Sequence, residues 1–200
     1  MTIAALSTTT TTRRPLADVL VARSAVTSTA LVIAGAALTA AAAQVSVPLW
    51  PVPITGQTLA VLLVGSALGA RRGALSMALY ALLGLVGLPV YADGGSGAGV
   101  LLGASGGYVV GFIAAAALVG WVAERFGDRT WRTALLSFAL GTVVTFAVGM
   151  VWLAVVLGTD LQQTLEYGLY PFVVGGIAKA LIGAAVIRLG WTVVLRRRRD

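Results

Sequence analysis

Hydrophobic residues run along this chain in long blocks, which short segments rich in proline, glycine or charge separate. The apolar blocks cover about residues 25–47, 55–69, 73–88, 107–123, 133–157 and 171–195. About 20 apolar residues in a helix cross the ~30 Å hydrocarbon layer of a bilayer. The pattern therefore predicts an all-α integral membrane protein with six transmembrane helices in one domain, residues 25–195. A threonine-rich segment, residues 1–24, is expected to be a disordered tail, and residues 196–200 a basic tail.

Composition supports a membrane-embedded fold. The chain is 58% hydrophobic and only 10% charged, with a mean hydropathy of +0.95. A soluble domain carries roughly 25% charged residues. Lipid is therefore the expected solvent for most of the surface.

Basic residues fall on one side of the predicted bundle. Of the 14 Lys and Arg residues, all but two lie in the two tails, in the connection between the second and third predicted spans, or in that between the fourth and fifth. These twelve are Arg13, Arg14, Arg23, Arg71, Arg72, Arg125, Arg129, Arg132 and Arg196 to Arg199. Basic residues flanking membrane spans stay cytoplasmic. Both termini are therefore expected on the cytoplasmic side of the cytoplasmic membrane. The same placement explains the net charge of +7 without a nucleic-acid partner.

A glycine-rich segment, VYADGGSGAGVLLGASGG, interrupts the apolar pattern at residues 90–107. It contains no nucleotide-binding pattern of the GxxxxGK[ST] or GxGxxG type. Its GASG fragment resembles the GxSG of intramembrane serine proteases, but the chain has no histidine to act as general base. With no cysteine or histidine, the usual transition-metal ligands are missing too. We therefore expect neither enzymatic activity nor a bound metal or cofactor. We interpret the glycine-rich segment as a lid or a flexible connector.

Lys179 is the most unusual residue in the predicted spans. It lies eight residues after Pro171, which is ~12 Å along a helix at about 1.5 Å per residue. A charge at that depth costs roughly 2.5–3.5 kcal/mol, so it is rarely placed there without a partner or a function. No acidic residue lies in any predicted span. The partner of Lys179 must therefore be a loop carboxylate, a backbone carbonyl or an anionic ligand.

Three stretches resemble the BioY family, the biotin-binding S components of energy-coupling-factor transporters. They are AQVSVPLWPVPITGQT at residues 43–58, LGARRGALSMALYALLGLVGLPVYADGGSGAGVLLGASGGYVVGF at residues 68–112, and PFVVGGIAK at residues 171–179. The resemblance implies six helices, an outward-facing biotin pocket, and a lid made by the 1–2 and 3–4 connections. It also implies that the chain takes up biotin from outside. The partners it implies are a transmembrane coupling subunit and two cytoplasmic ATPase subunits.

Residue roles follow from that resemblance. Lys179 would pair with the charged or carbonyl end of biotin, with Gln57 and Ser96 giving neutral hydrogen bonds. The remaining expected site residues are Tyr91 and Tyr108 on the apolar body, Asp93 at the lid, and the lid glycines Gly94, Gly95 and Gly97. Small residues on the first span, for docking the coupling subunit, are Ala30, Ala34, Ala36 and Ala40.

The chain departs from the family pattern at Gly176, where the family usually has an aspartate. Another acceptor for the ureido group is therefore required. Two alternatives to biotin uptake stay open: an S component for another small vitamin, and a membrane scaffold that transports nothing.

Overall fold

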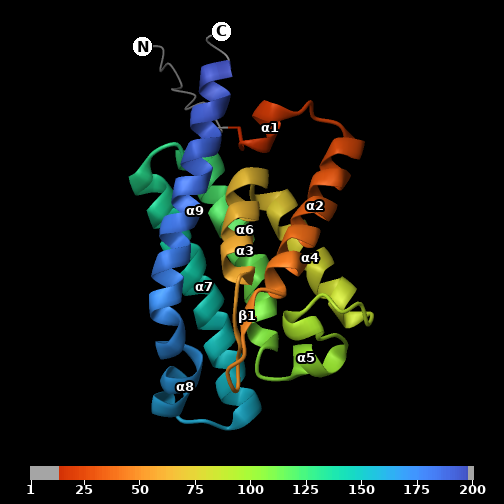
Figure 1. The fold of residues 1–200 in the computed structure, drawn as a ribbon, viewed down its shortest axis with the longest axis vertical. Coiled ribbons are helices and arrows are strands. Elements are labelled where there is room, and N and C mark those ends of the chain that lie inside the picture. The colour runs from red at the N-terminus through yellow and green to blue at the C-terminus, as the bar shows by residue number, and fades with distance from the viewer. Residues whose placement is uncertain (1–13, 198–200) are drawn as a thin grey trace, which may run out of the picture.

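The chain forms a bundle of helices in the computed structural model, which describes residues 14–197 (Figure 1). The elements, in chain order, are α1 (Ala17–Leu20), α2 (Ala25–Ala43), β1 (Ser46–Val47), β2 (Ile54–Thr55), α3 (Gln57–Leu68), α4 (Ala70–Leu85), the 3₁₀ turn η1 (Ala92–Gly94), α5 (Ala98–Leu102), α6 (Gly106–Phe126), α7 (Trp131–Leu157), α8 (Leu161–Gly168) and α9 (Tyr170–Arg197).

Each of the six predicted apolar blocks overlaps one of the helices α2, α3, α4, α6, α7 and α9. In the described part of the chain, α2, α6, α7 and residues 170–196 of α9 are long and apolar enough to cross a membrane. The other two are shorter, with 12 residues in α3 and 16 in α4. The protein is a multi-pass membrane protein, and the count of six crossings stays a prediction.

The two ends of the bundle differ in chemistry. One end, here called the basic end, carries α1, the α3–α4 turn, the α6–α7 loop and the last turns of α9 (Figure 1). The other, the hairpin end, carries β1, β2, α5 and α8 (Figure 1). Arginines 71, 72, 125, 129 and 132 all lie near the basic end, as the charge pattern predicted.

Glycines make the α3–α4 turn compact. Gly69 has φ +84°, a conformation that favours glycine, and it ends α3. Gly120 of α6 faces this turn so closely that a Cβ there would lie 2.2 Å from the backbone nitrogen of Ala70. Because only a residue without a side chain fits, α6 packs directly against both short helices.

The last part of the expected tail, residues 14–24, lies in the described part of the chain and makes defined contacts. Residues 17–20 form α1, Ala17 is buried in the core, and the Asp18 carboxylate ion-pairs with Arg23 and with Arg72 of α4, the latter at 2.8 Å. Burial of Ala17 and the ion pairs of Asp18 hold this segment against the bundle. Composition alone did not reveal these contacts. Residues 1–13 lie outside the described part.

The connections at the hairpin end contain more secondary structure than the sequence indicated. β1 and β2 pair antiparallel around the proline-rich segment, with Ser46 opposite Thr55. Short helices α5 and α8 lie in the 3–4 and 5–6 connections, and Asp160 caps α8 by accepting a hydrogen bond from the Gln163 N–H at 2.8 Å. Both helices are too short for their hydrophobic pattern to be noticed between longer blocks.

Candidate ligand-binding site

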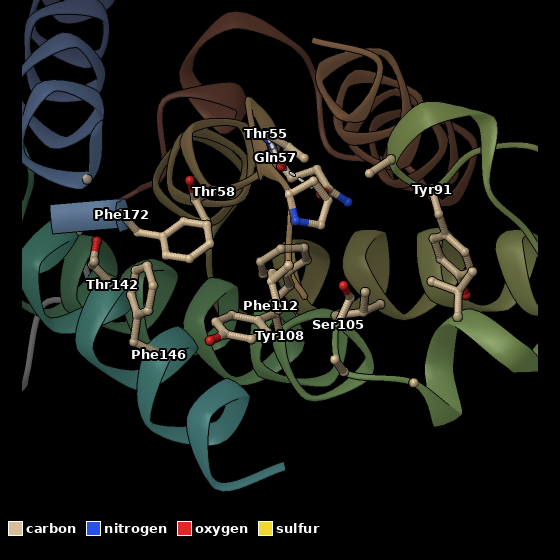
Figure 2. A pocket seen from close by; sticks show the side chains of 18 of the residues that line it. Thr55, Gln57, Thr58, Tyr91, Ser105, Tyr108, Phe112, Thr142, Phe146 and Phe172 are labelled. Carbon is tan, nitrogen blue, oxygen red and sulfur yellow. Dashed lines mark hydrogen bonds between the residues drawn. The ribbon is translucent and has the colours of Figure 1, made fainter. Parts of the chain in front are cut away.

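A cavity of about 340 Å³ lies beside the hairpin and the glycine-rich segment (Figure 2). Six parts of the chain meet around it: the hairpin, the start of α3, the glycine-rich segment, the first half of α6, and the facing parts of α7 and α9. Its lining residues are Val52, Pro53, Thr55, Gln57, Thr58, Leu62, Tyr91, Ala92, Gly99, Val100, Gly103, Ala104, Ser105, Tyr108, Val109, Phe112, Thr142, Phe146, Phe172, Gly176 and Lys179.

Lys179 is the charged residue of this cavity. Its ammonium donates to the Thr55 carbonyl oxygen at 2.5 Å and to the Thr58 hydroxyl at 3.1 Å, so it is held by the end of β2 and the first turn of α3. A lysine ammonium has three N–H donors. Within residues 14–197 it makes no ion pair, and the described lining residues include no acidic side chain. One donor and an uncompensated positive charge therefore remain at the cavity wall.

Gln57 lies beside this cation in a buried hydrogen-bond network. Its side-chain oxygen accepts from the Thr55 hydroxyl at 2.7 Å, and its side-chain nitrogen donates to the hydroxyl of Tyr80, which is buried in α4. These contacts fix the orientation of the amide. Since a carboxamide has two donor hydrogens and an acceptor oxygen with two lone pairs, Gln57 keeps capacity for a ligand.

An aromatic wall forms the apolar side of the cavity. The ring of Tyr108 lies 5.8 Å from that of Phe146 and 6.3 Å from that of Phe172, and Phe146 and Phe172 are 5.6 Å apart. The Tyr108 hydroxyl donates to the Gly168 carbonyl at 2.9 Å, which directs its ring edge toward α8. Figure 2 shows Tyr91 on the opposite side of the cavity from this trio. Such a wall suits an apolar ligand body.

The structure brings four of the expected site residues to the cavity: Gln57, Tyr91, Tyr108 and Lys179. The expected residues of the lid lie outside its lining. Ser96, Asp93 and Gly94 are exposed, and Gly95 and Gly97 are half-buried in the same turn. The lid residues therefore do not line the cavity themselves, although their neighbours Tyr91 and Ala92 do.

Sequence reasoning missed several residues that line the cavity. The polar ones are Thr55, Thr58, Ser105 and Thr142. Thr55 and Thr58 hold Lys179, whereas in the described part of the chain neither the Ser105 nor the Thr142 hydroxyl has a hydrogen-bond partner in the protein. In the sequence, Ser105 stands out only as the serine of the GASG fragment. Phe112, Phe146 and Phe172 were hidden because phenylalanine in an apolar block does not differ from any lipid-facing residue.

The four alanines expected at a docking face divide between two faces of α2. Ala30 and Ala34 are exposed, whereas Ala36 is 1% exposed and packs in the core with Ala40 beside it. Ala36 and Ala40 therefore face the bundle interior, and only Ala30 and Ala34 are available at the surface of the chain. Helical spacing alone could not choose between these faces because α2 is rich in alanine throughout.

Comparisons with known proteins agree on one family. The sequence model described as the BioY family matches residues 10–196. The biotin transporter BioY2 of Lactococcus lactis subsp. cremoris is 34% identical over 165 residues, which cover 80% of this chain and 90% of the relative. The biotin transporter BioY of Thermotoga maritima is 37% identical over 158 residues, 79% of this chain and 88% of the relative.

A solved structure is similar as well. The crystal structure of the S-component for biotin from an ECF-type ABC transporter superposes with a TM-score of 0.75 at 25% sequence identity. The match covers 88% of this chain and 92% of the other.

Proposed function

Because this chain belongs to the BioY family, we propose that it is the substrate-capture subunit of an energy-coupling-factor transporter and binds biotin for uptake across the cytoplasmic membrane. The observation that carries the proposal is Lys179, a cation with a remaining donor on the wall of a cavity that is otherwise neutral and aromatic. Biotin has a carboxylate, an apolar body and a ureido ring, and each of these meets a matching part of the cavity.

We assign the carboxylate of biotin to Lys179 and its apolar body to Tyr108, Phe146 and Phe172. The ureido ring needs acceptors for its N–H groups and a donor for its carbonyl. Gln57, Ser105 and Thr142 together offer both, without the aspartate that Gly176 replaces. Neutral hydrogen bonds are weaker than charged ones, so several of them are needed to take over that role.

For the arrangement in the membrane, we propose six crossings by α2, α3, α4, α6, α7 and α9 within one domain, residues 25–195, with both termini in the cytoplasm. The arginines near the basic end support this orientation. The hairpin end and its cavity then face outside. A cytoplasmic tail before residue 14 is part of the same proposal.

The proposed partners are a transmembrane coupling subunit and two cytoplasmic ATPase subunits. The exposed small residues Ala30 and Ala34 of α2 would let a partner helix approach closely. The sequence contains no nucleotide-binding motif of its own, so the ATP-driven step requires other chains.

Equilibrium binding of biotin to the purified chain tests the site. Lys179→Ala should weaken binding by about 10- to 150-fold, because a hydrogen bond to a charged group contributes roughly 1.5–3 kcal/mol. The matched control is Arg188→Ala, on the same helix but exposed and outside the cavity lining, which should bind like the native protein.

Biotinamide, which lacks the carboxylate charge, identifies the contact itself. If the carboxylate meets Lys179, biotinamide should bind the native chain more weakly than biotin does, and Lys179→Ala should remove that difference. Equal losses for both ligands in the variant would place the carboxylate elsewhere. No binding of biotin to the native chain, with retention of another vitamin in a competition series, would contradict the assignment of biotin.

A further inference from the structure

The lid that the family resemblance implies corresponds to the hairpin segment, residues 44–56, and the glycine-rich turn, residues 91–97. We propose that Gln44, Ser46 and Asp93 join these two segments, so that they move as one cap over the cavity. These three are positioning residues that control how fast a bound ligand leaves. The inference deepens the proposed function, since it concerns the release of the ligand from the same cavity.

Gln44 provides the first joint. It is the residue that ends α2, and its side-chain nitrogen donates to the Tyr91 carbonyl at 3.1 Å. Its side-chain oxygen accepts from the Gly94 N–H, also at 3.1 Å. One amide therefore holds both ends of the η1 turn, 47 and 50 residues away in sequence. The same nitrogen donates to the Ala40 carbonyl, which ties the joint to the last turn of α2.

Ser46 and Asp93 provide the second joint. The Ser46 hydroxyl, in β1, donates to the Asp93 carboxylate. Asp93 has φ +55°, a left-handed conformation that asparagine, aspartate and glycine adopt far more readily than other residues. Its exposed side chain lies outside the cavity lining. Asp93 is thus placed to join the two segments, and it does not contact the ligand space.

Both joined segments are walls of the cavity. The hairpin contributes Val52, Pro53 and Thr55, and the turn contributes Tyr91 and Ala92. Thr55 is also the residue whose carbonyl holds Lys179. Neither segment can swing away alone without breaking the hydrogen bonds at the joint, so opening requires the two to move together. Since Gln44 caps the end of α2 and donates to the Ala40 carbonyl, the position of this helix is coupled to the cap.

Release of labelled biotin into excess unlabelled biotin measures the effect. Ser46→Ala removes the donor, and Asp93→Gly removes the acceptor while keeping a residue that accepts positive φ. Each should speed dissociation by about 3- to 10-fold, the effect of one ordinary hydrogen bond. The double variant should release biotin no faster than the faster single variant, because both remove the same contact. Asp93→Asn keeps an acceptor oxygen and the backbone conformation, so it should release biotin at the native rate.

Three results would overturn the proposal: native dissociation rates in both single variants, multiplied effects in the double variant, or an Asp93→Asn rate equal to that of Asp93→Gly. The first would show that the joint does not limit release. The second would show that the two residues act separately, and the third that the acceptor oxygen is irrelevant.

A distance measurement tests the joint without a ligand, and so separates it from the identity of the substrate. The chain has no cysteine, so spin labels can be attached at Val47→Cys in the hairpin and Ser96→Cys in the turn, both exposed. The label–label distance distribution should be narrow in this background, broaden on adding Asp93→Gly, and narrow again with Asp93→Asn. A distribution that is equally narrow with Asp93→Gly would contradict the joint even if biotin binds, whereas the expected series would support it even if biotin does not.

Discussion

Two charged side chains, Lys179 in the hairpin-end half and Asp128 in the basic-end half, lie among the helices of this bundle, and their surroundings are opposite. Lys179 lines a cavity and is held by a carbonyl and a hydroxyl, which leaves a donor available. Asp128, in the α6–α7 loop, is 2% exposed and lies outside the lining of that cavity.

Each carboxylate oxygen of Asp128 accepts a hydrogen bond from a buried side chain. Its two carboxylate oxygens accept from the Ser66 hydroxyl of α3 and from the Trp191 indole N–H of α9, the latter at 2.7 Å. The Arg129 guanidinium lies 4.3 Å from the Trp191 ring centre. The same carboxylate therefore ties three parts of the basic end together around Phe138 and the core beside it.

The difference between the two residues shows how a buried charge can be interpreted. A carboxyl group that accepts hydrogen bonds from buried side chains of different helices holds those helices together, whereas an ammonium that keeps a donor beside a cavity is available to a ligand. We therefore expect the basic end to act as a structural base and the hairpin end to carry the proposed recognition site.

Removing Asp128 should have the largest effect on stability. Asp128→Ala leaves the Trp191 N–H and the Ser66 hydroxyl buried without their acceptor, which should lower the free energy of unfolding by about 2–4 kcal/mol. Affinity for biotin should hardly change, because distant sites act independently. Denaturant unfolding and biotin binding in one detergent would measure both, with Asp128→Asn, which retains one acceptor, as the intermediate control. A loss of affinity as large as that of Lys179→Ala would contradict the division into base and recognition site.

Filling the cavity should have the opposite pattern of effects: it should weaken biotin binding and leave stability unchanged. A Cβ on Gly175 or on Gly176 would meet no atom within 4 Å, yet only Gly176 lines the cavity. Gly176→Leu should therefore weaken biotin binding by about 10- to 100-fold through overpacking, whereas Gly175→Leu should leave it near native. Neither variant should lower stability. Equal affinities for the two variants would show that the ligand does not approach this part of α9.

The smallest expected effect is a pH dependence at the basic end. Burial raises the pKa of Asp18, but the hydrogen bonds and charges of Arg23 and Arg72 outweigh it and hold that pKa below the ordinary value of 3.8. Because the folded pKa is depressed, the ion pairs stabilise fully above about pH 4 and lose their contribution as the pH falls through the folded pKa. Asp18→Asn should be less stable than the native chain at neutral pH, with a difference that shrinks on acidification.

Asp128 should titrate in the opposite sense. Burial raises its pKa despite the hydrogen bonds from Ser66 and Trp191, so its ionisation costs stability as the pH rises from 3.8 through the folded pKa. Unfolding midpoints from about pH 3 to about pH 7 for the native chain, Asp18→Asn and Asp128→Asn would separate the two contributions. Parallel curves for all three proteins would exclude both.

The sequence predicted the helices well because each falls in a long apolar block, and a bilayer requires that pattern regardless of how helices pack. It also indicated Lys179, since a lone charge in such a block is conspicuous. It could not locate Ser105, Thr142 or the phenylalanines, which resemble their neighbours in composition. Nor did it show α1 to be ordered, because Asp18 meets Arg72 only after α4 has folded beside it.

Hydrophobic length and the distribution of arginines thus determined, from the sequence alone, a helical membrane protein and the position of its one deep lysine. Only the tertiary structure decided which face of each helix is interior and that the Lys179 ammonium meets the Thr55 carbonyl, 124 residues away in sequence. It also decided that Gln44 and Ser46 meet the glycine-rich turn. The physical reason is that apolar helices in lipid have no hydrophobic preference for one face, so close packing and hydrogen bonds between distant segments select it.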